Sequence, residues 1–250
     1  MPDAERMAHR TPEGGRWSGR RIGITGARGA LGGALCRVLR QRGAEVIGLT
    51  HSSLPPPTED GPERWIAWQC GDEDQLRATL AELDILVINH GINPQGDLDP
   101  DTVDRALEIN ALSSWRLLRL FESIATGRGA EQPSEVWVNT SEAEIQPALS
   151  PVYELSKRLI GQLISLRGTQ RGAVERERLR IRKLVLGPFR SDLNPIGLMT
   201  AGFVAQQVIF QAGLGLNLII VTPNPLTYLL MPMHELARRL YSAMLSRRDR

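Results

Sequence analysis

Cysteine, long apolar runs and a surplus of charge are all scarce in this chain of 250 residues. Its two cysteines, Cys36 and Cys70, match no metal-ligand spacing and can form at most one bridge, so neither a disulfide scaffold nor a metal site is expected. No apolar run reaches about 18 residues, and residues 1–17 lack a signal-peptide core, so we expect neither a spanning helix nor a leader. The formal net charge of +2 is too small to predict a nucleic-acid partner. We therefore expect a cytoplasmic protein whose membrane contact, where it occurs, is peripheral.

From Arg21 onward, short apolar runs alternate with segments of helical spacing. The apolar runs predict seven strands, at Ile22–Thr25, Glu45–Leu49, Trp65–Gln69, Ile85–Ile88, Val136–Val138, Leu179–Leu186 and Leu218–Val221. The segments between them predict helices, at Leu31–Arg42, Glu73–Leu83, Thr102–Ile124, Val152–Arg167 and Ala201–Ala212. This alternation predicts one α/β domain over residues 21–250, a doubly wound parallel seven-stranded sheet with helices on both faces. Residues 1–20 predict a flexible lead-in, and loops are predicted at Ser52–Pro62, Gly127–Ser134 and Gly168–Arg178.

A glycine-rich turn separates the first predicted strand from the first predicted helix. It reads Thr25-Gly26-Ala27-Arg28-Gly29-Ala30-Leu31-Gly32. Glycines at such a turn let the backbone approach a pyrophosphate, and the N–H groups and dipole at the helix N-terminus favour the phosphate charge. A plain strand-to-helix turn is the alternative, but the strand before and the helix after favour dinucleotide binding.

The second predicted strand ends without the acidic residue that would hold the ribose hydroxyls of NAD. Its end reads Leu49-Thr50-His51-Ser52-Ser53, while Arg28 in the glycine turn offers a guanidinium for a 2′-phosphate. The sequence therefore favours NADP(H) over NAD(H), with Thr50 and His51 beside the nucleotide. In the alternative interpretation, Arg28 is a solvated loop residue.

Tyr153 and Lys157 lie four residues apart at the start of a predicted helix, so both side chains share one face. Only Lys157 and Lys183 are lysines among the 30 basic residues, and a compact ammonium suits a small polar site. Such a cation lowers the pKa of a phenol and makes it a competent acid or base. The pair alone is commonplace, and the alternative is an ordinary helix pair.

Together with the glycine turn and Ser141, this pair resembles the short-chain dehydrogenase/reductase family from about Arg21 onward. Thr25–Gly32 resembles the family's nucleotide turn, Asn89-His90-Gly91 its Asn-Asn-Ala-Gly strand end, and Gly187-Pro188 with Ser191 its nicotinamide-side segment. The resemblance implies a Rossmann fold, and it implies a catalytic set of Asn110, Ser141, Tyr153 and Lys157. By the same resemblance Tyr153 is the general acid/base, Ser141 orients the reacting oxygen, Lys157 binds the nicotinamide ribose, and Asn110 holds a relay water. Cofactor contacts are implied at Thr25, Gly26, Arg28, Gly29, Gly32, Thr50, His51, Asn89, Gly91, Tyr153, Lys157, Gly187, Pro188 and Ser191.

Three departures from the family pattern leave alternatives open. The glycine spacing also occurs in epimerase-like relatives, which raises an epimerase or dehydratase as an alternative reaction. The interval from Ser141 to Tyr153 is one residue shorter than usual, so Thr140 competes for the hydroxyl role. His90 replaces an asparagine, and we interpret it as a packed loop histidine with no catalytic role.

From Leu193 to His234 the chain contains no Asp, Glu, Lys or Arg. Several prolines exclude a spanning helix here, so this apolar region, about residues 190–234, predicts a lid, a groove or a membrane-facing surface. A buried last strand with a dimer interface is the alternative. Beyond it, Glu235–Arg250 predicts an amphipathic helix with Arg238, Arg239, Arg247 and Arg248 on its polar side, suited to an anionic bilayer or to packing on its own domain.

We therefore expect an NADP(H)-dependent oxidoreductase that interconverts a carbonyl and an alcohol on a lipophilic, isoprenoid- or sterol-like substrate. The family resemblance further implies a homodimer or homotetramer. The competing hypothesis is a non-catalytic nucleotide-binding protein of this fold that senses redox state or assists assembly of a membrane complex.

Overall fold

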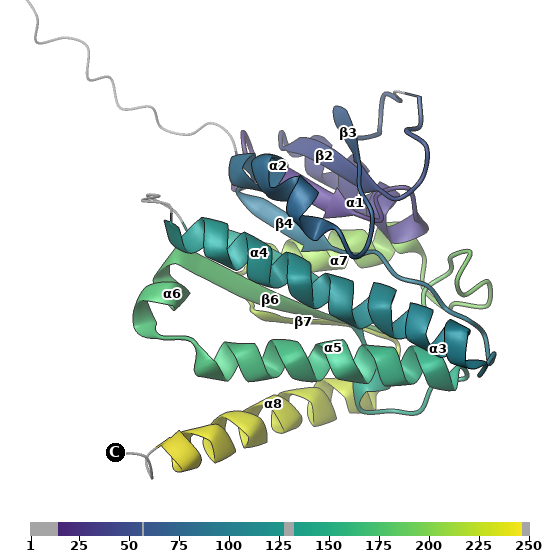
Figure 1. Cartoon of the computed structure of the whole chain (residues 1–250), viewed down its shortest axis with the longest axis vertical. Coiled ribbons are helices and arrows are strands. Elements are labelled where there is room, and N and C mark those ends of the chain that lie inside the picture. The colour runs from purple at the N-terminus through teal and green to yellow at the C-terminus, as the bar shows by residue number, and fades with distance from the viewer. Residues whose placement is uncertain (1–14, 57, 128–132, 247–250) are drawn as a thin grey trace, which may run out of the picture.

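The structure is a computed structural model, and it describes residues 15–56, 58–127 and 133–246. Seven parallel strands form one sheet in the order β3-β2-β1-β4-β5-β6-β7 (Figure 1). The strands are β1 Arg21–Thr25, β2 Glu45–Thr50, β3 Arg64–Ala67, β4 Ile85–Ile88, β5 Ser134–Ser141, β6 Leu179–Leu186 and β7 Leu218–Val221. The helices are α1 Ala30–Arg40, α2 Arg77–Glu82, α3 Pro100–Leu107, α4 Ser113–Gly127, α5 Pro151–Gln170, α6 Ala173–Arg178, α7 Ala201–Gly213 and α8 Pro225–Ser246. The predicted fold class is confirmed, and the predicted strand ends differ from the observed ones by at most three residues.

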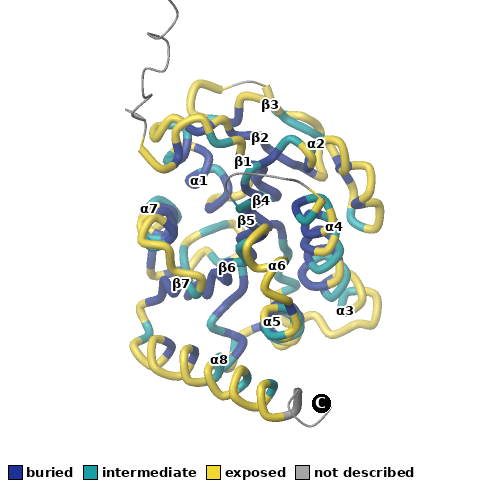
Figure 2. The backbone as a smooth tube through the Cα atoms, turned by 90° about the vertical axis from the view of Figure 1, so that its left-hand side faces the viewer, coloured by how far each residue is buried: buried dark blue, intermediate teal, exposed yellow. Residues whose placement is uncertain are grey.

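Helices cover both faces of this sheet, as Figure 2 shows. Helices α1 and α7 pack on one face, and α2, α4 and α5 pack on the other. In β4, Ile85 and Val87 join the first core cluster, whereas Leu86 and Ile88 join the second. This alternation follows from the two-residue repeat of a strand, and a strand buried on both faces is apolar throughout.

The predicted helix Thr102–Ile124 is divided by a π turn at Glu108–Leu112. Asp99 caps α3 by accepting hydrogen bonds from the backbone N–H groups of Asp101 and Thr102. The π turn holds Asn110, whose amide binds both polar backbone atoms of Ile92. The wider π turn thus coincides with the contact between Asn110 and Ile92, and the helical period of the sequence does not reveal either.

Two segments predicted as irregular are ordered by tertiary contacts. Residues 15–20 do not form a flexible lead-in, because Trp17 is buried and its ring centroid lies 5.5 Å from that of Trp137. Arg16 also forms an ion pair with Glu135 at 3.3 Å. Residues 1–14 of the predicted lead-in lie outside the described residues.

Part of the predicted loop Gly168–Arg178 is helical, since α5 continues to Gln170 and α6 follows. Glu175 explains α6: its carboxylate accepts a hydrogen bond from the Gly172 backbone and pairs with Arg167 at 2.7 Å. Charged side chains hold this short helix, so it has no apolar period to detect.

The last helix, α8, runs through Pro232 without a break, although a proline inside a helix usually ends it. The sequence had indicated an apolar segment followed by a separate helix from Glu235. Thr227 and Met231, which precede the proline, are fully buried. Glu235, which follows it, pairs with Lys183 at 2.8 Å. Contacts on both sides of the proline thus hold the helix in one piece. No helix in the described part of the chain is both long and apolar enough to cross a membrane.

Candidate active site

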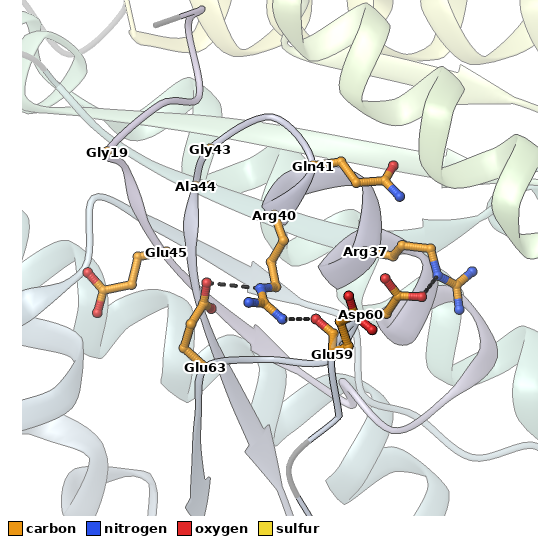
Figure 3. A pocket seen from close by; sticks show the side chains of 10 residues that line it. All are labelled: Gly19, Arg37, Arg40, Gln41, Gly43, Ala44, Glu45, Glu59, Asp60 and Glu63. Atoms are coloured by element: carbon orange, nitrogen blue, oxygen red, sulfur yellow. Dashed lines mark hydrogen bonds and ion pairs between the residues drawn. The ribbon is translucent and has the colours of Figure 1, made fainter.

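A cavity of about 1060 Å³ opens at the carboxyl ends of the strands, the usual ligand position in a doubly wound sheet. Its lining includes all the predicted cofactor contacts except Thr25 and Gly32, and three of the four predicted catalytic residues, Ser141, Tyr153 and Lys157. Most of the predicted site therefore converges on one cavity. A smaller hollow of about 500 Å³ lies at the end of α1 (Figure 3). Its two arginines are paired, Arg37 with Asp60 and Arg40 with Glu63, so it lacks the convergent free cationic donors of an anion-binding site.

The glycine turn has the backbone geometry that a pyrophosphate requires. Gly26 adopts φ of 62°, and a Cβ at Gly32 would lie 2.2 Å from the Gly26 carbonyl oxygen. Gly29 caps α1 with no side chain, and the first turn of α1 contains no acidic residue. The N–H groups at this helix end are thus left to meet an anion, and the turn fits a dinucleotide.

Thr25 lies behind the cavity wall instead of lining it. The side chain is fully buried, and Oγ1 accepts hydrogen bonds from the backbone N–H groups of Asn89 and His90 at 2.8 and 3.2 Å. The same oxygen lies 2.9 Å from His90 Nδ1. Thr25 therefore ties the end of β1 to the end of β4 and supports the turn, and Gly32 likewise packs beneath it.

Arg28 lies where the sequence interpretation required it. Its guanidinium donates to the Ser53 carbonyl at 3.3 Å and is otherwise exposed, next to Thr50 and His51 in the cavity lining. The carboxylates in the lining are Glu142 and Asp192, which follow β5 and β6, so neither belongs to the end of β2. The Arg28 guanidinium, with no cavity-lining carboxylate at the end of β2, suits the 2′-phosphate of NADP(H).

Ser141, Tyr153 and Lys157 meet at the far end of the cavity from Arg28's loop, on β5 and α5. The Ser141 side chain hydrogen-bonds Tyr153, and Lys157 Nζ lies 5.6 Å from the centre of the Tyr153 ring. Lys157 Nζ also donates to the Asn139 carbonyl at 3.3 Å. The competing hydroxyl of Thr140 donates to the Leu184 carbonyl at 3.0 Å and is buried, so the geometry favours Ser141 as the partner of Tyr153.

Burial dominates the electrostatics of this pair. It raises the pKa of Tyr153, contrary to the expectation that Lys157 lowers it, and the hydrogen bond from Ser141 opposes that rise. It also lowers the pKa of Lys157 from 10.5 to about 8, with the Glu144 charge acting in the opposite sense. The Tyr153 phenol can exchange its proton with a bound alcohol or carbonyl, beside a Lys157 ammonium whose pKa is not far above neutral pH.

Asn110 is committed to backbone contacts in the π turn between α3 and α4. Its Nδ2 donates to the Ile92 carbonyl and to Ser156 Oγ, both at 2.9 Å, while Oδ1 accepts from the Ile92 N–H at 2.8 Å. A Cβ at Gly91 would lie 2.9 Å from this Oδ1. Asn110 therefore positions the strand end that faces Lys157, and a relay water held by its side chain stays a prediction.

Sequence reasoning missed several polar residues that shape the cavity. Asn139 Nδ2 donates to Asn89 Oδ1 at 2.9 Å, and its place just before Ser141 at a strand end was a signal that could have identified it. Asn93 Nδ2 donates to the Leu193 carbonyl at 3.2 Å and so joins segments 100 residues apart. No local pattern indicates such a contact. Gly187, Pro188 and Ser191 also line the cavity, and their contact with a cofactor stays a prediction.

Comparisons with known proteins identify the family of this chain. Residues 22–158 match the model of the NAD dependent epimerase/dehydratase family. The chain is 43% identical to the monoglucosyldiacylglycerol epimerase of Synechocystis over 89% of its own length, but it spans only 54% of that relative.

A short-chain dehydrogenase of Burkholderia cenocepacia in complex with NADP superposes with a TM-score of 0.71 at 17% identity, covering 92% of this chain and 98% of that one. A 3-ketoacyl-(acyl-carrier-protein) reductase of Brucella melitensis complexed with NADH gives 0.69 at 20% identity, covering 82% and 98%. The chain belongs to the NAD dependent epimerase/dehydratase family, enzymes of the short-chain dehydrogenase/reductase type that use a nicotinamide nucleotide.

Proposed function

We propose that this chain is the catalytic unit of an epimerase that inverts one hydroxyl-bearing carbon in the sugar of a glycolipid. The observation that carries the proposal is the meeting of Ser141, Tyr153 and Lys157 in a cavity that also contains a phosphate-type glycine turn. The family match and the name of the Synechocystis relative supply the reaction class and the lipid. In this proposal the substrate is a glycolipid instead of the isoprenoid- or sterol-like molecule expected from the sequence. The reaction still passes through the predicted interconversion of an alcohol and a carbonyl.

The residues of the chain would handle the proton and the orientation. Tyr153 accepts the proton of the sugar hydroxyl, Ser141 hydrogen-bonds the same oxygen, and the Lys157 ammonium stabilises the phenolate that Tyr153 needs for this step. When bound, a nicotinamide nucleotide would supply reversible hydride transfer at the sugar carbon. When Tyr153 gives its proton back to the carbonyl oxygen after the sugar has presented its other face, the product is the epimer and no net oxidation occurs.

Arg28 supports NADP(H) as the preferred nucleotide. The guanidinium is exposed on the glycine turn, and the end of β2 offers Thr50 and His51 in place of a carboxylate. An acidic residue there would repel the 2′-phosphate, whereas Arg28 can donate two charge-assisted hydrogen bonds to it.

The mouth of the cavity supports a lipid-linked substrate. Leu149 is 93% exposed and Ile196 is 75% exposed, and both belong to the cavity lining. The apolar region predicted from the sequence continues from here into α7 and α8, whose exposed side chains include Phe203, Phe210, Leu229, Met233 and Leu236. A cavity with polar groups at Ser141, Tyr153 and Lys157 and apolar side chains at its mouth suits a molecule with a sugar head and acyl chains.

The test is product analysis with monoglucosyldiacylglycerol and NADP+ supplied to the purified chain. We expect a glycolipid with an epimeric sugar to accumulate while the nicotinamide absorbance shows no net change. Tyr153→Phe should lower the rate by about a hundredfold or more without weakening NADPH binding, because it removes only the proton-transferring hydroxyl. Net nucleotide reduction with a ketone product would instead identify a simple dehydrogenase, and NADPH binding without any turnover of a lipid would favour the non-catalytic alternative.

A further inference from the structure

Three side chains of metal-binding type converge at the carboxyl ends of β2, β3 and β4. They are His51, Cys70 and His90, and one donor atom of each lies within 4.8 Å of the other two. Cys70 Sγ lies 3.8 Å from His51 Nε2. Cys70 is a free thiol, so its sulfur is available to a ligand. Because each residue follows a different strand, the parallel sheet, not a local motif, creates this cluster.

His90 has a nitrogen that the described part of the protein leaves unsatisfied. The side chain is 5% exposed, Nδ1 lies 2.9 Å from Thr25 Oγ1, and Nε2 is buried and makes no hydrogen bond of good geometry, although the ring also interacts with the Ile109 backbone. An unpartnered buried polar atom is destabilising, so proteins seldom keep one without a reason. A cation bound at Nε2 would satisfy it.

His51 is oriented in the way that a metal-ligating histidine usually is. Its ring hydrogen-bonds the Trp68 backbone and stacks on the Trp68 indole, with ring centroids 4.1 Å apart. Ligand histidines commonly use one ring nitrogen for such a bond while the other binds the metal. His51 Nε2 is the nitrogen near Cys70. At His90, a cation on Nε2 would require the ring proton to move to Nδ1, beside Thr25 Oγ1.

We propose that His51, Cys70 and His90 form a binding site for a zinc-type cation, with a fourth coordination position open to the cavity. One thiolate with two imidazoles is a ligand set that Zn²⁺ and Cu⁺ favour. A tetrahedral centre needs these donor atoms about 3.5 Å apart, so the cluster must close by about 1 Å. His51 is exposed and Cys70 half-buried, so both can move toward the buried His90. Binding forms a metal–sulfur bond and releases the thiol proton to solvent.

This site would control access to the nucleotide cavity. All three residues line that cavity on the side of Arg28 and Thr50. If the nucleotide binds as in the proposed function, on which this step rests, its adenosine half needs the same space. A bound cation and the dinucleotide should therefore exclude each other, which makes the cation an inhibitor and not a resident cofactor.

Cobalt is the most direct probe, since a Co²⁺–thiolate bond gives a near-ultraviolet absorption band that oxygen and nitrogen ligands do not. We expect this band with one Co²⁺ per chain, displaced by Zn²⁺. Cys70→Ser should abolish the band, and His51→Ala, a change at an exposed residue, should weaken Zn²⁺ binding about tenfold or more. The control is Cys36→Ala, which removes the other free cysteine, buried in α1 away from the cavity, and should leave the band intact. Absence of the band, or its survival in folded Cys70→Ser protein, would overturn the proposal.

Zn²⁺ titration with and without NADPH tests whether the cation and the nucleotide exclude each other. Saturating NADPH should raise the apparent Kd for Zn²⁺ by about tenfold or more, and an unchanged Kd in protein that binds NADPH would overturn the exclusion. Protein that binds Co²⁺ through Cys70 but binds no nucleotide would contradict the proposed function and leave the metal site supported. The two failures are thus distinguishable.

Discussion

Lys157 carries its charge in a buried position, and this makes the stability of the protein depend on pH. Its pKa falls from 10.5 to about 8 in the folded chain, so between these values the unfolded chain binds more protons than the folded one. The free energy of unfolding should therefore rise with pH across that window, by up to about 1.4 kcal/mol per pH unit. Urea unfolding of the wild type and of Lys157→Met, compared across the window, isolates this contribution. The same slope in both proteins would contradict it.

Arg28 is expected to set the choice of nucleotide. Arg28→Ala should weaken NADPH binding about tenfold or more and leave NADH binding nearly unchanged, because only NADPH has the 2′-phosphate. Energy transfer from tryptophan to the nicotinamide measures both affinities. Arg37→Ala is the matched control, since Arg37 lies on the helix after the same turn but pairs with Asp60 outside the cavity. An equal loss for both nucleotides would mean that Arg28 contacts a part they share.

Helix α5 positions the catalytic pair through a close contact at Gly161. A Cβ there would lie 2.0 Å from Glu144 Cδ, and Glu144 is buried against Lys183 at 2.6 Å. Gly161→Ala should therefore destabilise the fold by about 1–3 kcal/mol. Gly168→Ala in the same helix has open space and should stabilise it by about 0.5–1 kcal/mol. Thermal or urea unfolding of the two variants gives the comparison, and equal effects would show that Glu144 can move aside.

Helix α8 is joined to the catalytic loop by polar contacts as well as by packing. Thr222 and Thr227 both donate hydrogen bonds to the Glu142 carboxylate, next to Ser141. Gln146 in the same loop donates to Thr227 Oγ1 at 2.8 Å. Helix α8, which exposes much of the apolar surface, is therefore attached to the loop that follows Ser141.

At the scale of the whole molecule, the exposed apolar surface of α8 predicts binding to anionic bilayers. Figure 2 shows α8 at the edge of the fold with most of its length exposed. Nine of the larger apolar or aromatic side chains described in α8 are at least 40% exposed, including Leu229, Leu236 and Leu240, and Arg238 and Arg239 lie on the same helix. The predicted Arg247 and Arg248 of this polar side lie outside the described residues.

Co-sedimentation with vesicles tests this surface. The wild type should bind vesicles that contain anionic lipid and release them at high salt, because screening weakens the arginine contribution. Serine at Leu229, Leu236 and Leu240 together should abolish binding, whereas Val174→Ser, at an exposed apolar residue of α6, should not. If the triple variant instead converts a dimer to a monomer and wild-type protein ignores vesicles, a second copy of the chain covers α8 and the prediction is wrong.

Much of this protein was predictable because its signals are local. The short apolar runs of buried strands such as β4 and the helical period of segments such as α1 determine the doubly wound fold without distant contacts. The glycine turn and the Tyr153–Lys157 spacing are likewise written in short stretches of sequence. Together with the family resemblance, they identified site residues most of which line the cavity.

The remainder was decided by tertiary structure, because it depends on which strand ends and helices become neighbours. Trp17 meets Trp137, Pro232 stays within α8, and Thr25 turns its hydroxyl to the end of β4, although no local pattern indicates any of these contacts. The parallel sheet also gathers His51, Cys70 and His90, whose spacing along the chain matches no metal motif. Sequence periodicity determines which face of an element is buried, whereas the packing of distant segments determines which polar atoms meet there.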